Sequence, residues 1–364
     1  MPVSLESVSA KPPPSSSRSE AVLVAGVNWL GDSVMSMPAL QAYRRIHPQT
    51  RLVMLVKPPL AGLWSLHQAI DEVWTLPDNL GGMLLTARRA ASERFRCAFV
   101  LPHSFRSALA PFLARIPDRV GLPGHGRDWM LTRIEQPPCR PALEHQCHEY
   151  RALFGVTDLP LETPRLNLSG QLSDAALQRL NGLESPRVAL LPGAAYGPAK
   201  RWPAEYFITL GGMLKSALHC GIVVLGSGSE RDLCARVTAG IGSGAVDFAG
   251  RTTLPEFAAL LAHCALVVAN DSGGMHLATA AGVPVLAIFG ITDPQKTGPL
   301  GERVRILQDS VRRSRDIERN SEEAVLALRR IKPEQALAAA RALLHGGGGM
   351  VQDPVEQRKK YRDK

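Results

Sequence analysis

Short apolar runs alternate with longer amphipathic segments along the first half of the chain. Apolar runs of buried parallel-strand type occupy residues 21–26, 51–56, 71–77 and 97–104, and helical patterns fill the intervals at 33–46 and 80–95. Strands that alternate with helices predict a parallel sheet with right-handed crossovers.

The same alternation restarts after a stretch punctuated by Pro and Gly around residues 160–186. The second half contains further predicted strands at 187–193, 221–226, 245–250, 265–270 and 283–290. We therefore expect an α/β protein with two Rossmann-like, doubly wound parallel-sheet domains that face a central cleft. The expected division is a disordered tail at 1–20, an N-terminal domain at 21–175, a C-terminal domain at 176–332, a helix at 333–345 and a flexible tail at 346–364.

Composition and charge narrow the range of functions. The chain of 364 residues has 45% hydrophobic residues and no apolar run long enough to span a bilayer, and its six cysteines lack short paired spacings. These features predict a cytoplasmic protein with reduced thiols. The net charge of +9 favours anionic partners. Aromatic residues are only 5% of the chain and no nucleic-acid-binding motif is present, so we expect no nucleic-acid partner.

The loop after the first predicted strand, NWLGDS, contains Asn28, Gly31 and Asp32. Gly31 permits a tight backbone path, and Asp32 lies at the predicted start of a helix. One interpretation makes Asp32 an N-cap, which stabilises a helix by about 1 kcal/mol. The other makes it a general base aimed into the cleft. The residues alone leave both interpretations open.

A second loop, PGAAYGPAKRWP, follows the strand predicted at 187–193 and contains Gly193, Lys200 and Arg201. A glycine-rich loop lets backbone N–H groups approach an oxyanion, and a lysine adds mobile positive charge for a diphosphate. The alternative is a solvated surface lysine. Because Trp202 should pin the loop where the next helix begins, phosphate binding is favoured.

The most specific signal is NDSGGMHLATAAG over residues 270–282. It lies between a predicted strand and a helix rich in small residues, so the helix N-terminus presents free N–H donors and a partial positive charge. This predicts an anion site formed by Asp271, Ser272, Gly273 and Gly274. For His276, one turn into the helix, a packed core role and a ligand contact both stay open.

Other turns at predicted strand ends could frame a nucleoside. They are LGSGSERD with Ser227, AGRTTLP over 249–255, and GITDP with Thr292 and Asp293. Each alone is an ordinary turn with a helix cap. The chain contains no GxxxxGK[ST], GxGxxG or GxSxG motif, which excludes a P-loop, a standard dinucleotide fingerprint and a nucleophile elbow. The spacing of Cys139, His145, Cys147 and His148 fits no zinc pattern.

Four segments, taken together, resemble glycosyltransferase family 9 and, within it, the type II heptosyltransferases. They are NWLGDSVMSMPAL, LPHSFRSALAPFLARIPDRVGL, LLPGAAYGPAKRWPAEYF and NDSGGMHLATAAGVPVLAIFGITDP, in the family's order between about residues 21 and 307. The resemblance implies a GT-B fold, an acceptor held by the N-terminal half, ADP-heptose held by the C-terminal half, and inversion at the anomeric carbon. It also implies no metal or other cofactor, with which the lack of a DxD carboxylate pair agrees.

The resemblance implies roles for individual residues. Asp32 matches the catalytic aspartate, Lys200 the diphosphate-binding lysine and Asp271 the residue that contacts the heptose. We expect the donor also to contact Gly193, Arg201, Ser227, Ser272, Gly273, Gly274, His276, Thr292 and Asp293, and the acceptor to contact Asn28, Ser104 and Arg106.

The expected acceptor is the heptosyl-Kdo2-lipid A inner core, which makes peripheral contact with the inner face of the inner membrane an expectation as well. Many family members carry a segment with Cys and His after the last strand, where this chain has SVRRSRDIERNSEEA, so the substrate detail is open. An epimerase or hydrolase acting on nucleotide sugars, another heptosyltransferase type (I or III), and a non-catalytic nucleotide-binding protein are the alternatives.

Overall fold

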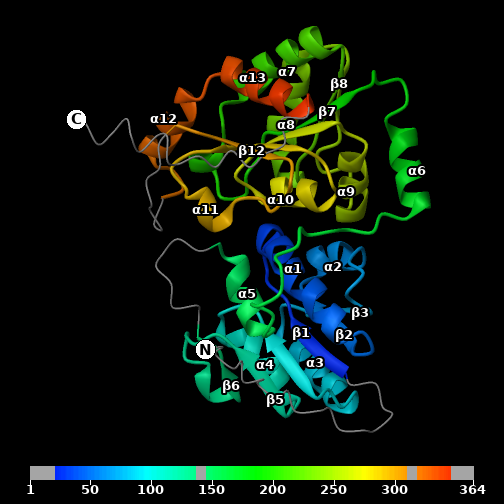
Figure 1. Ribbon diagram of the computed structural model, residues 1–364, viewed down its shortest axis with the longest axis vertical. Helices are drawn as coiled ribbons and strands as arrows, with labels where there is room; N and C mark the ends of the chain where they lie inside the picture. The colour runs from blue at the N-terminus through cyan, green and yellow to red at the C-terminus, as the bar shows by residue number, and fades with distance from the viewer. Residues whose placement is uncertain (1–20, 137–144, 310–317, 346–364) are drawn as a thin grey trace, which may run out of the picture.

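The computed structural model describes residues 21–136, 145–309 and 318–345. The chain forms two halves, one above the other in Figure 1, each built on a parallel sheet of six strands. The predicted tails at 1–20 and 346–364 lie outside the described residues. The predicted architecture of two Rossmann-like sheets is confirmed.

The N-terminal sheet has the strand order β3-β2-β1-β4-β5-β6. Its strands are β1 (Ala21–Ala25), β2 (Arg51–Val56), β3 (Glu72–Thr75), β4 (Cys97–Val100), β5 (Asp118–Gly121) and β6 (Arg133–Ile134). Its helices are α1 (Leu30–Ile46), α2 (Pro58–Trp64), α3 (Leu80–Ser92), α4 (Phe105–Leu113) and α5 (Cys147–Leu153), with a 3₁₀ turn η1 (Asp128–Met130).

The C-terminal sheet has the order β12-β11-β10-β7-β8-β9, which repeats the N-terminal topology. Its strands are β7 (Arg187–Leu191), β8 (Gly221–Val224), β9 (Ala245–Asp247), β10 (Leu266–Asn270), β11 (Val285–Phe289) and β12 (Val304–Gln308). The helices are α6 (Gly170–Arg179), α7 (Ala204–Leu218), α8 (Arg231–Ile241), α9 (Leu254–Ala262), α10 (Gly273–Ala280), α11 (Pro294–Thr297), α12 (Glu322–Arg330) and α13 (Pro333–Leu344), with 3₁₀ turns η2 (Pro198–Lys200) and η3 (Gly228–Glu230).

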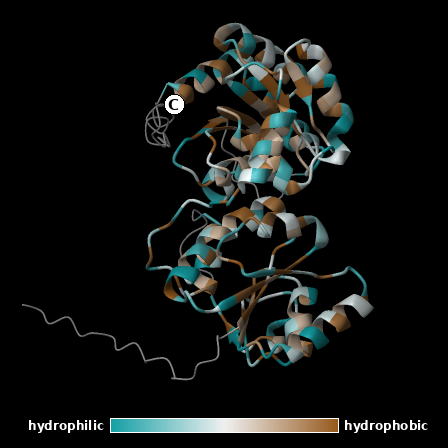
Figure 2. Cartoon of the chain, turned by 90° about the vertical axis from the view of Figure 1, so that its right-hand side faces the viewer, coloured by the Kyte–Doolittle hydropathy of each residue, from teal (hydrophilic) through white to brown (hydrophobic). Residues whose placement is uncertain are grey.

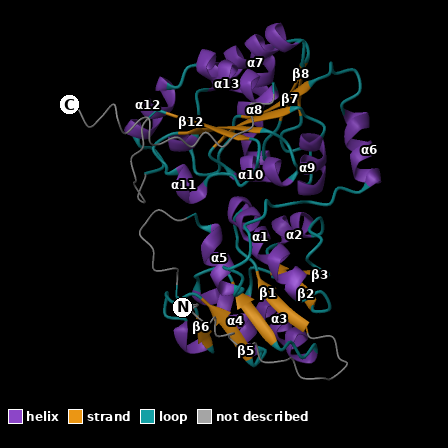
Figure 3. Cartoon of the chain, viewed as in Figure 1, coloured by secondary structure: helices purple, strands orange, loops and turns teal. Residues whose placement is uncertain are grey.

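The central strands are apolar because helices cover both faces of each sheet, as Figure 3 shows. Val24 in β1 lies beside Met54 of β2 and Phe99 of β4, and all three are buried. In the other half, Val268 of β10 pairs with Leu190 and Leu286 and is fully buried. Figure 2 shows brown, apolar residues along the strands of both halves.

Both sheets reverse their strand order beside their first strand, between β1 and β4 and between β7 and β10. In open parallel sheets, ligands bind outside the carboxyl ends of the strands at such a reversal. The loops that follow β1, β7 and β10 are therefore the places where this topology puts a binding site.

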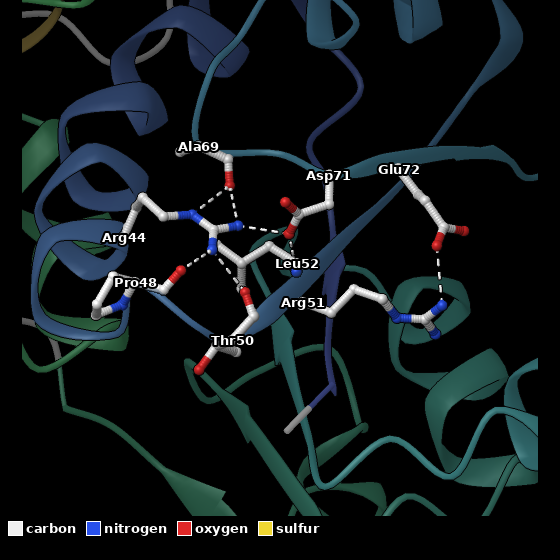
Figure 4. A network of polar contacts seen from close by, with 8 residues as sticks. All are labelled: Arg44, Pro48, Thr50, Arg51, Leu52, Ala69, Asp71 and Glu72. Carbon is white, nitrogen blue, oxygen red and sulfur yellow. Dashed lines mark hydrogen bonds and ion pairs between the residues drawn. The ribbon is translucent and has the colours of Figure 1, made fainter. Parts of the chain in front are cut away.

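A network of polar contacts holds the C-terminal end of α1 to the loops that precede β2 and β3 (Figure 4). The guanidinium of Arg44 donates hydrogen bonds to the carbonyl oxygens of Ala69, at 2.8 Å, and Thr50, at 2.7 Å, and lies 2.5 Å from the Asp71 carboxylate. The same Asp71 oxygen accepts a 2.7 Å hydrogen bond from the N–H of Leu52 in β2. These contacts fix the direction of α1, whose other end points at the second half.

The two halves are joined by direct contacts as well as by the connecting chain. The N–H of Leu166 donates to the carbonyl oxygen of Ala280 over 3.0 Å, and the N–H of Gln146 donates to that of Lys296 over 2.9 Å. α1 also packs against α10. The boundary predicted between residues 175 and 176 falls inside α6, which packs against α9 of the C-terminal half.

None of the helices in the described part of the chain is long and apolar enough to cross a lipid bilayer.

Candidate functional site

A cleft of about 700 Å³ lies between the two halves and has walls from both. The N-terminal half contributes the first turn of α1, and the C-terminal half contributes the loops after β7, β8, β9 and β10. The lining includes Trp29, Leu30, Gly31, Asp32, Met35, Gly193, Tyr196, Lys200, Ser227, Glu230, Thr253, Phe257, Asp271, Ser272, Gly273, Gly274, His276 and Arg319. The cleft thus brings together most of the predicted donor residues and the predicted base.

Asp32 lies in the first turn of α1, where Trp29 is the N-cap residue. Its carboxylate makes no hydrogen bond with any residue in the described ranges, so the N-cap interpretation is not what the structure shows. Burial raises the pKa of Asp32 above its ordinary value, while Lys200 lowers it and Glu149 raises it further. A partly buried carboxylate that has no hydrogen-bond partner among the described residues and has a raised pKa is a stronger base than a solvated one.

Lys200 and Asp271 form an ion pair in the wall of the cleft that faces Asp32. The Nζ atom of Lys200 lies 2.6 Å from Oδ2 of Asp271, and the side chains are 22% and 6% exposed respectively. The same carboxylate oxygen accepts a 2.8 Å hydrogen bond from the hydroxyl of Thr292. Lys200 is therefore held in place by a buried carboxylate and is not a solvated surface lysine.

The loop that carries Lys200 is anchored to the sheet by buried polar contacts. The side chain of Asn270, at the end of β10, accepts a 3.0 Å hydrogen bond from the N–H of Trp202 and donates one of 2.8 Å to the carbonyl of Pro192. The indole N–H of Trp202 donates to the carbonyl of Ile331 over 2.9 Å, and the ring is 1% exposed. The prediction that Trp202 pins this loop is confirmed.

The N-termini of α1 and α10 meet at the floor of the cleft, and glycine makes this approach possible. A Cβ atom on Gly273 would lie 2.8 Å from the Cβ of Leu30, and one on Gly31 would lie 3.0 Å from the ring of His276. Two helix N-termini, each with unsatisfied N–H groups and a partial positive charge, thus point into one space. This arrangement favours an anion.

His276 is 4% exposed, and its Nδ1 atom has no hydrogen-bond partner among the described residues. Burial, with smaller contributions from His145 and Lys200, lowers its pKa to about 3. The ring is therefore neutral at physiological pH and contributes shape and a neutral nitrogen to the site, with no positive charge.

Sequence reasoning missed Glu230, which projects from η3 into the same cleft. Its Oε2 atom accepts hydrogen bonds from the N–H of Ser227, at 2.7 Å, and from the Ser227 hydroxyl, at 2.8 Å. A Cβ atom on Gly193 would lie only 2.0 Å from Glu230 Oε1, so only glycine fits opposite this carboxylate. The sequence signal was available, since Ser-x-x-Glu is the signature of a capping box.

Tyr196, Phe257 and Arg319 also line the cleft and had no predicted role. Tyr196 and Phe257 present aromatic rings, for which the sequence offers no signal beyond their residue type. Arg319 comes from the segment after β12, which the sequence marks only as basic.

The lining of the cleft does not include six predicted donor or acceptor residues: Arg201, Thr292, Asp293, Asn28, Ser104 and Arg106. The guanidinium of Arg201 donates to the carbonyl of Ala194 at 3.1 and 3.0 Å and so supports the loop from behind. The carboxylate of Asp293 caps α11 by accepting the N–H of Gln295 at 2.9 Å. Asn28 is exposed just before α1.

The remaining two acceptor-side residues, Ser104 and Arg106, are exposed at the start of α4. Arg106 donates to the carbonyls of Pro77, at 3.2 Å, and of Asp78, so its guanidinium braces the loop after β3. The buried Arg127 holds the loop that precedes α4 by donating to the carbonyl of Pro102 and to the hydroxyl of Ser107.

No cluster of His, Cys, Asp and Glu that could hold a metal ion occurs within residues 21–136, 145–309 and 318–345. Cys139, part of the spacing considered for zinc, lies outside these ranges. In the cleft itself, positive charge comes from side chains and helix N-termini.

Comparison with known proteins agrees with this geometry. Residues 84–326 match the family model of glycosyltransferase family 9 (heptosyltransferase). Lipopolysaccharide heptosyltransferase 2 of Escherichia coli (strain K12) is 30% identical over 305 residues, which cover 79% of this chain and 87% of that protein. Lipooligosaccharide heptosyltransferase 2 of Haemophilus ducreyi is also 30% identical, over 79% of this chain and 88% of the relative.

Solved structures give the same picture. The structure of E. coli ADP-heptose lps heptosyltransferase II superposes with a TM-score of 0.78 at 27% identity and covers 91% of this chain and 100% of that one. A family 9 glycosyl transferase from Veillonella parvula, at 22% identity and a TM-score of 0.79, shares the fold over 90% of this chain and 97% of its own. The two facing Rossmann-like halves are thus the GT-B fold. With a family match over more than half its length and relatives at 30% identity, this chain belongs to glycosyltransferase family 9, the heptosyltransferases.

Proposed function

We propose that this enzyme transfers heptose from ADP-L-glycero-D-manno-heptose to a heptosyl-Kdo2-lipid A acceptor, with inversion and without a metal ion. One observation carries the proposal: Asp32 from the N-terminal half lines the same cleft as Lys200 and Asp271 from the C-terminal half. Similarity to heptosyltransferases named for type 2 activity supports the choice of substrates.

On the donor side, the diphosphate lies against Lys200 and the N-terminus of α10. The lysine ammonium and the free N–H groups of the helix stabilise the charge that grows on the diphosphate as ADP leaves. Because both are fixed by the fold before substrate arrives, their contribution requires little reorganisation in the transition state. Asp271 holds the lysine and, through its second carboxylate oxygen, is placed to accept a hydrogen bond from a heptose hydroxyl.

On the acceptor side, Asp32 takes the proton of the attacking hydroxyl as the oxygen bonds to the anomeric carbon and ADP departs from the opposite face. A single displacement of this kind inverts the anomeric centre. The raised pKa of Asp32 suits a base that must accept a proton, and the neighbouring Lys200 opposes the rise by favouring the ionised form.

The acceptor carries a lipid, which supports peripheral contact with the cytoplasmic face of a membrane. An exposed aromatic group in the N-terminal half fits such contact. Trp129 and Phe105 are 61% and 43% exposed, and their ring centroids are 6.3 Å apart. Trp is favoured at the interface between lipid and water, and basic side chains nearby, such as Arg106, favour anionic phosphates. Binding of phosphorylated acceptor should weaken as salt is raised.

Incubation with ADP-heptose and chemically defined truncated lipid A cores, followed by mass spectrometry, tests the proposal. Addition of one heptose to the core that already carries one heptose, with release of ADP, is the expected result. Free heptose without modified acceptor would identify a hydrolase, and an altered sugar still attached to ADP would identify an epimerase. Transfer only to the core that lacks heptose would assign the first heptose addition to this enzyme.

A further inference from the structure

The charge of the cleft leaves the proposed diphosphate only partly neutralised by the residues considered so far. Lys200 already lies 2.6 Å from the Asp271 carboxylate, so the pair has no net charge. His276 is neutral, because burial lowers its pKa to about 3. Glu230 brings a further negative charge into the same lining. A diphosphate gains charge as it becomes a leaving group, so a further cation in this cleft would stabilise it.

Arg319 supplies a cation in the right place. It is exposed, and it lines the same cleft as Lys200 and Asp271. The Cζ atom of Arg319 lies 5.5 Å from the centre of the Tyr196 ring, and the Nζ atom of Lys200 lies 5.6 Å from the same centre. One aromatic ring therefore contacts both cations, which keeps the arginine beside the lysine.

The main chain fixes the position of Arg319 independently of its side chain. The N–H of Ala199, next to Lys200, donates a 3.2 Å hydrogen bond to the carbonyl oxygen of Arg319. Gly197, two residues before Ala199, has φ of 112°, a backbone conformation that favours glycine, and a Cβ there would meet the Arg319 oxygen at an ordinary contact distance of 3.6 Å. The segment with Arg319 and the loop with Lys200 are thus joined directly through the main chain.

Packing of α12 completes this substructure. Ser321 caps α12 by accepting the N–H of Ala324 at 3.3 Å. Ala324 and Ala327 are buried in a small apolar cluster with Ala199 and Ile291. The helix that follows Arg319 is therefore docked on the turn η2 that ends in Lys200, and this docking explains why a basic residue far along the sequence reaches the cleft.

From this geometry we propose that Arg319 is a second cation for the diphosphate of the nucleotide donor. It supplies the net positive charge that the Lys200–Asp271 ion pair lacks. The inference rests on the proposed function and adds a residue to it. An arginine here can donate two parallel hydrogen bonds to phosphate oxygens, which a lysine cannot.

The test is the affinity of the full-length enzyme for ADP and for adenosine, measured by calorimetry and by competition, in wild type and in Arg319→Gln. A charge-assisted hydrogen bond at a site open to solvent corresponds to about a tenfold loss of affinity. We expect ADP to bind about tenfold more weakly to Arg319→Gln and adenosine to bind equally well. Arg319→Lys should recover part of the loss. Arg330→Gln, which removes an exposed cation of α12, is the matched control and should leave both affinities unchanged.

The substitution leaves the main-chain bond to Ala199 in place, and unchanged thermal unfolding verifies that the loop is intact. Equal ADP affinity in wild type and Arg319→Gln would overturn the inference, as would an equal loss for adenosine. A raised KM for the acceptor with unchanged ADP affinity would also overturn it and assign Arg319 to acceptor phosphates. If the wild-type enzyme did not bind ADP at all, the donor in the proposed function would be wrong, which is a distinguishable failure.

Discussion

Replacement of Lys200 by methionine should destabilise the fold as well as weaken nucleotide binding. Lys200→Met removes the cation that lies 2.6 Å from Asp271 Oδ2. It leaves a carboxylate that is 6% exposed and that, within the described ranges, keeps the Thr292 hydroxyl as its hydrogen-bond donor. An unpaired buried charge costs about 3–5 kcal/mol. Because Lys200 is 22% exposed at the edge of the cleft, water can replace part of the interaction, and we expect about 2–3 kcal/mol.

Urea unfolding measures this cost. With a slope of about 2–3 kcal/mol/M, the unfolding midpoint of Lys200→Met should fall by about 1 M. The double variant Lys200→Met, Asp271→Asn should recover much of the loss, because a neutral amide tolerates burial without a cation. Lys57→Met is the matched control: its ion pair with Asp78 spans 3.1 Å but is 43% and 72% exposed, so its removal should cost less than about 1 kcal/mol.

Two results would refute this reasoning. One is a midpoint for Lys200→Met that equals that of Lys57→Met, which would mean that water compensates the carboxylate fully. The other is a double variant that unfolds no later than Lys200→Met, since the loss would then come from side-chain packing. A coupling energy near zero in the double-mutant cycle would support the second explanation.

Glu149 raises the pKa of Asp32, so Glu149→Gln should lower it. The acidic limb of the pH profile of kcat/KM should then move to lower pH, and an unmoved limb would contradict this. Burial lowers the pKa of His67 from its ordinary value of 6.5 to about 4. The unfolded chain therefore binds this proton more tightly than the folded protein, and the folded protein loses stability as the pH falls from about 6.5 to 4. His67→Phe should abolish about 3 kcal/mol of acid destabilisation at pH 4 in denaturation curves, and equal pH dependence of both proteins would count against it. Gly273→Ala should force α1 and α10 apart, which should cost about 1–3 kcal/mol of stability and reduce turnover. Gly212→Ala, at an exposed position of α7 where an added Cβ meets nothing within 4 Å, should do neither. Equal turnover of the two variants would show that the close approach of α1 and α10 is not needed.

Much of the fold is predictable because strands of a parallel sheet that are buried on both faces appear in the sequence as continuous apolar runs. The patterns at 21–26 and 265–270 correspond to β1 and β10, which are buried over nearly their whole length. β6 was not predicted: it has only two residues, Arg133 and Ile134, and both are exposed at the sheet edge, so no apolar pattern marks it. Helix α6 was not predicted because it lies in a stretch whose Pro and Gly residues are typical of a linker. Helix α12 was not predicted because its segment shows a polar, basic composition and no clear apolar pattern.

The site was predictable where it depends on topology and less so where it depends on tertiary contacts. Asp32 and Asp271 follow central strands, so strand position alone directs them toward the reversal of strand order. Periodicity could not show that Arg201 turns back to the Ala194 carbonyl, because that choice depends on the path of one loop. Nor could it show Arg319 in the cleft, since α12 brings it there by docking on η2.

The central claim is that a carboxylate of one half acts on a donor held by the other, and Asp32→Asn tests it most directly. The asparagine keeps the size of the side chain and removes the base. The account predicts that turnover with ADP-heptose and a defined acceptor falls by about 10² to 10⁴, while the affinity for ADP, measured on the same preparation, stays close to that of wild type. Near-normal turnover of Asp32→Asn would contradict the account.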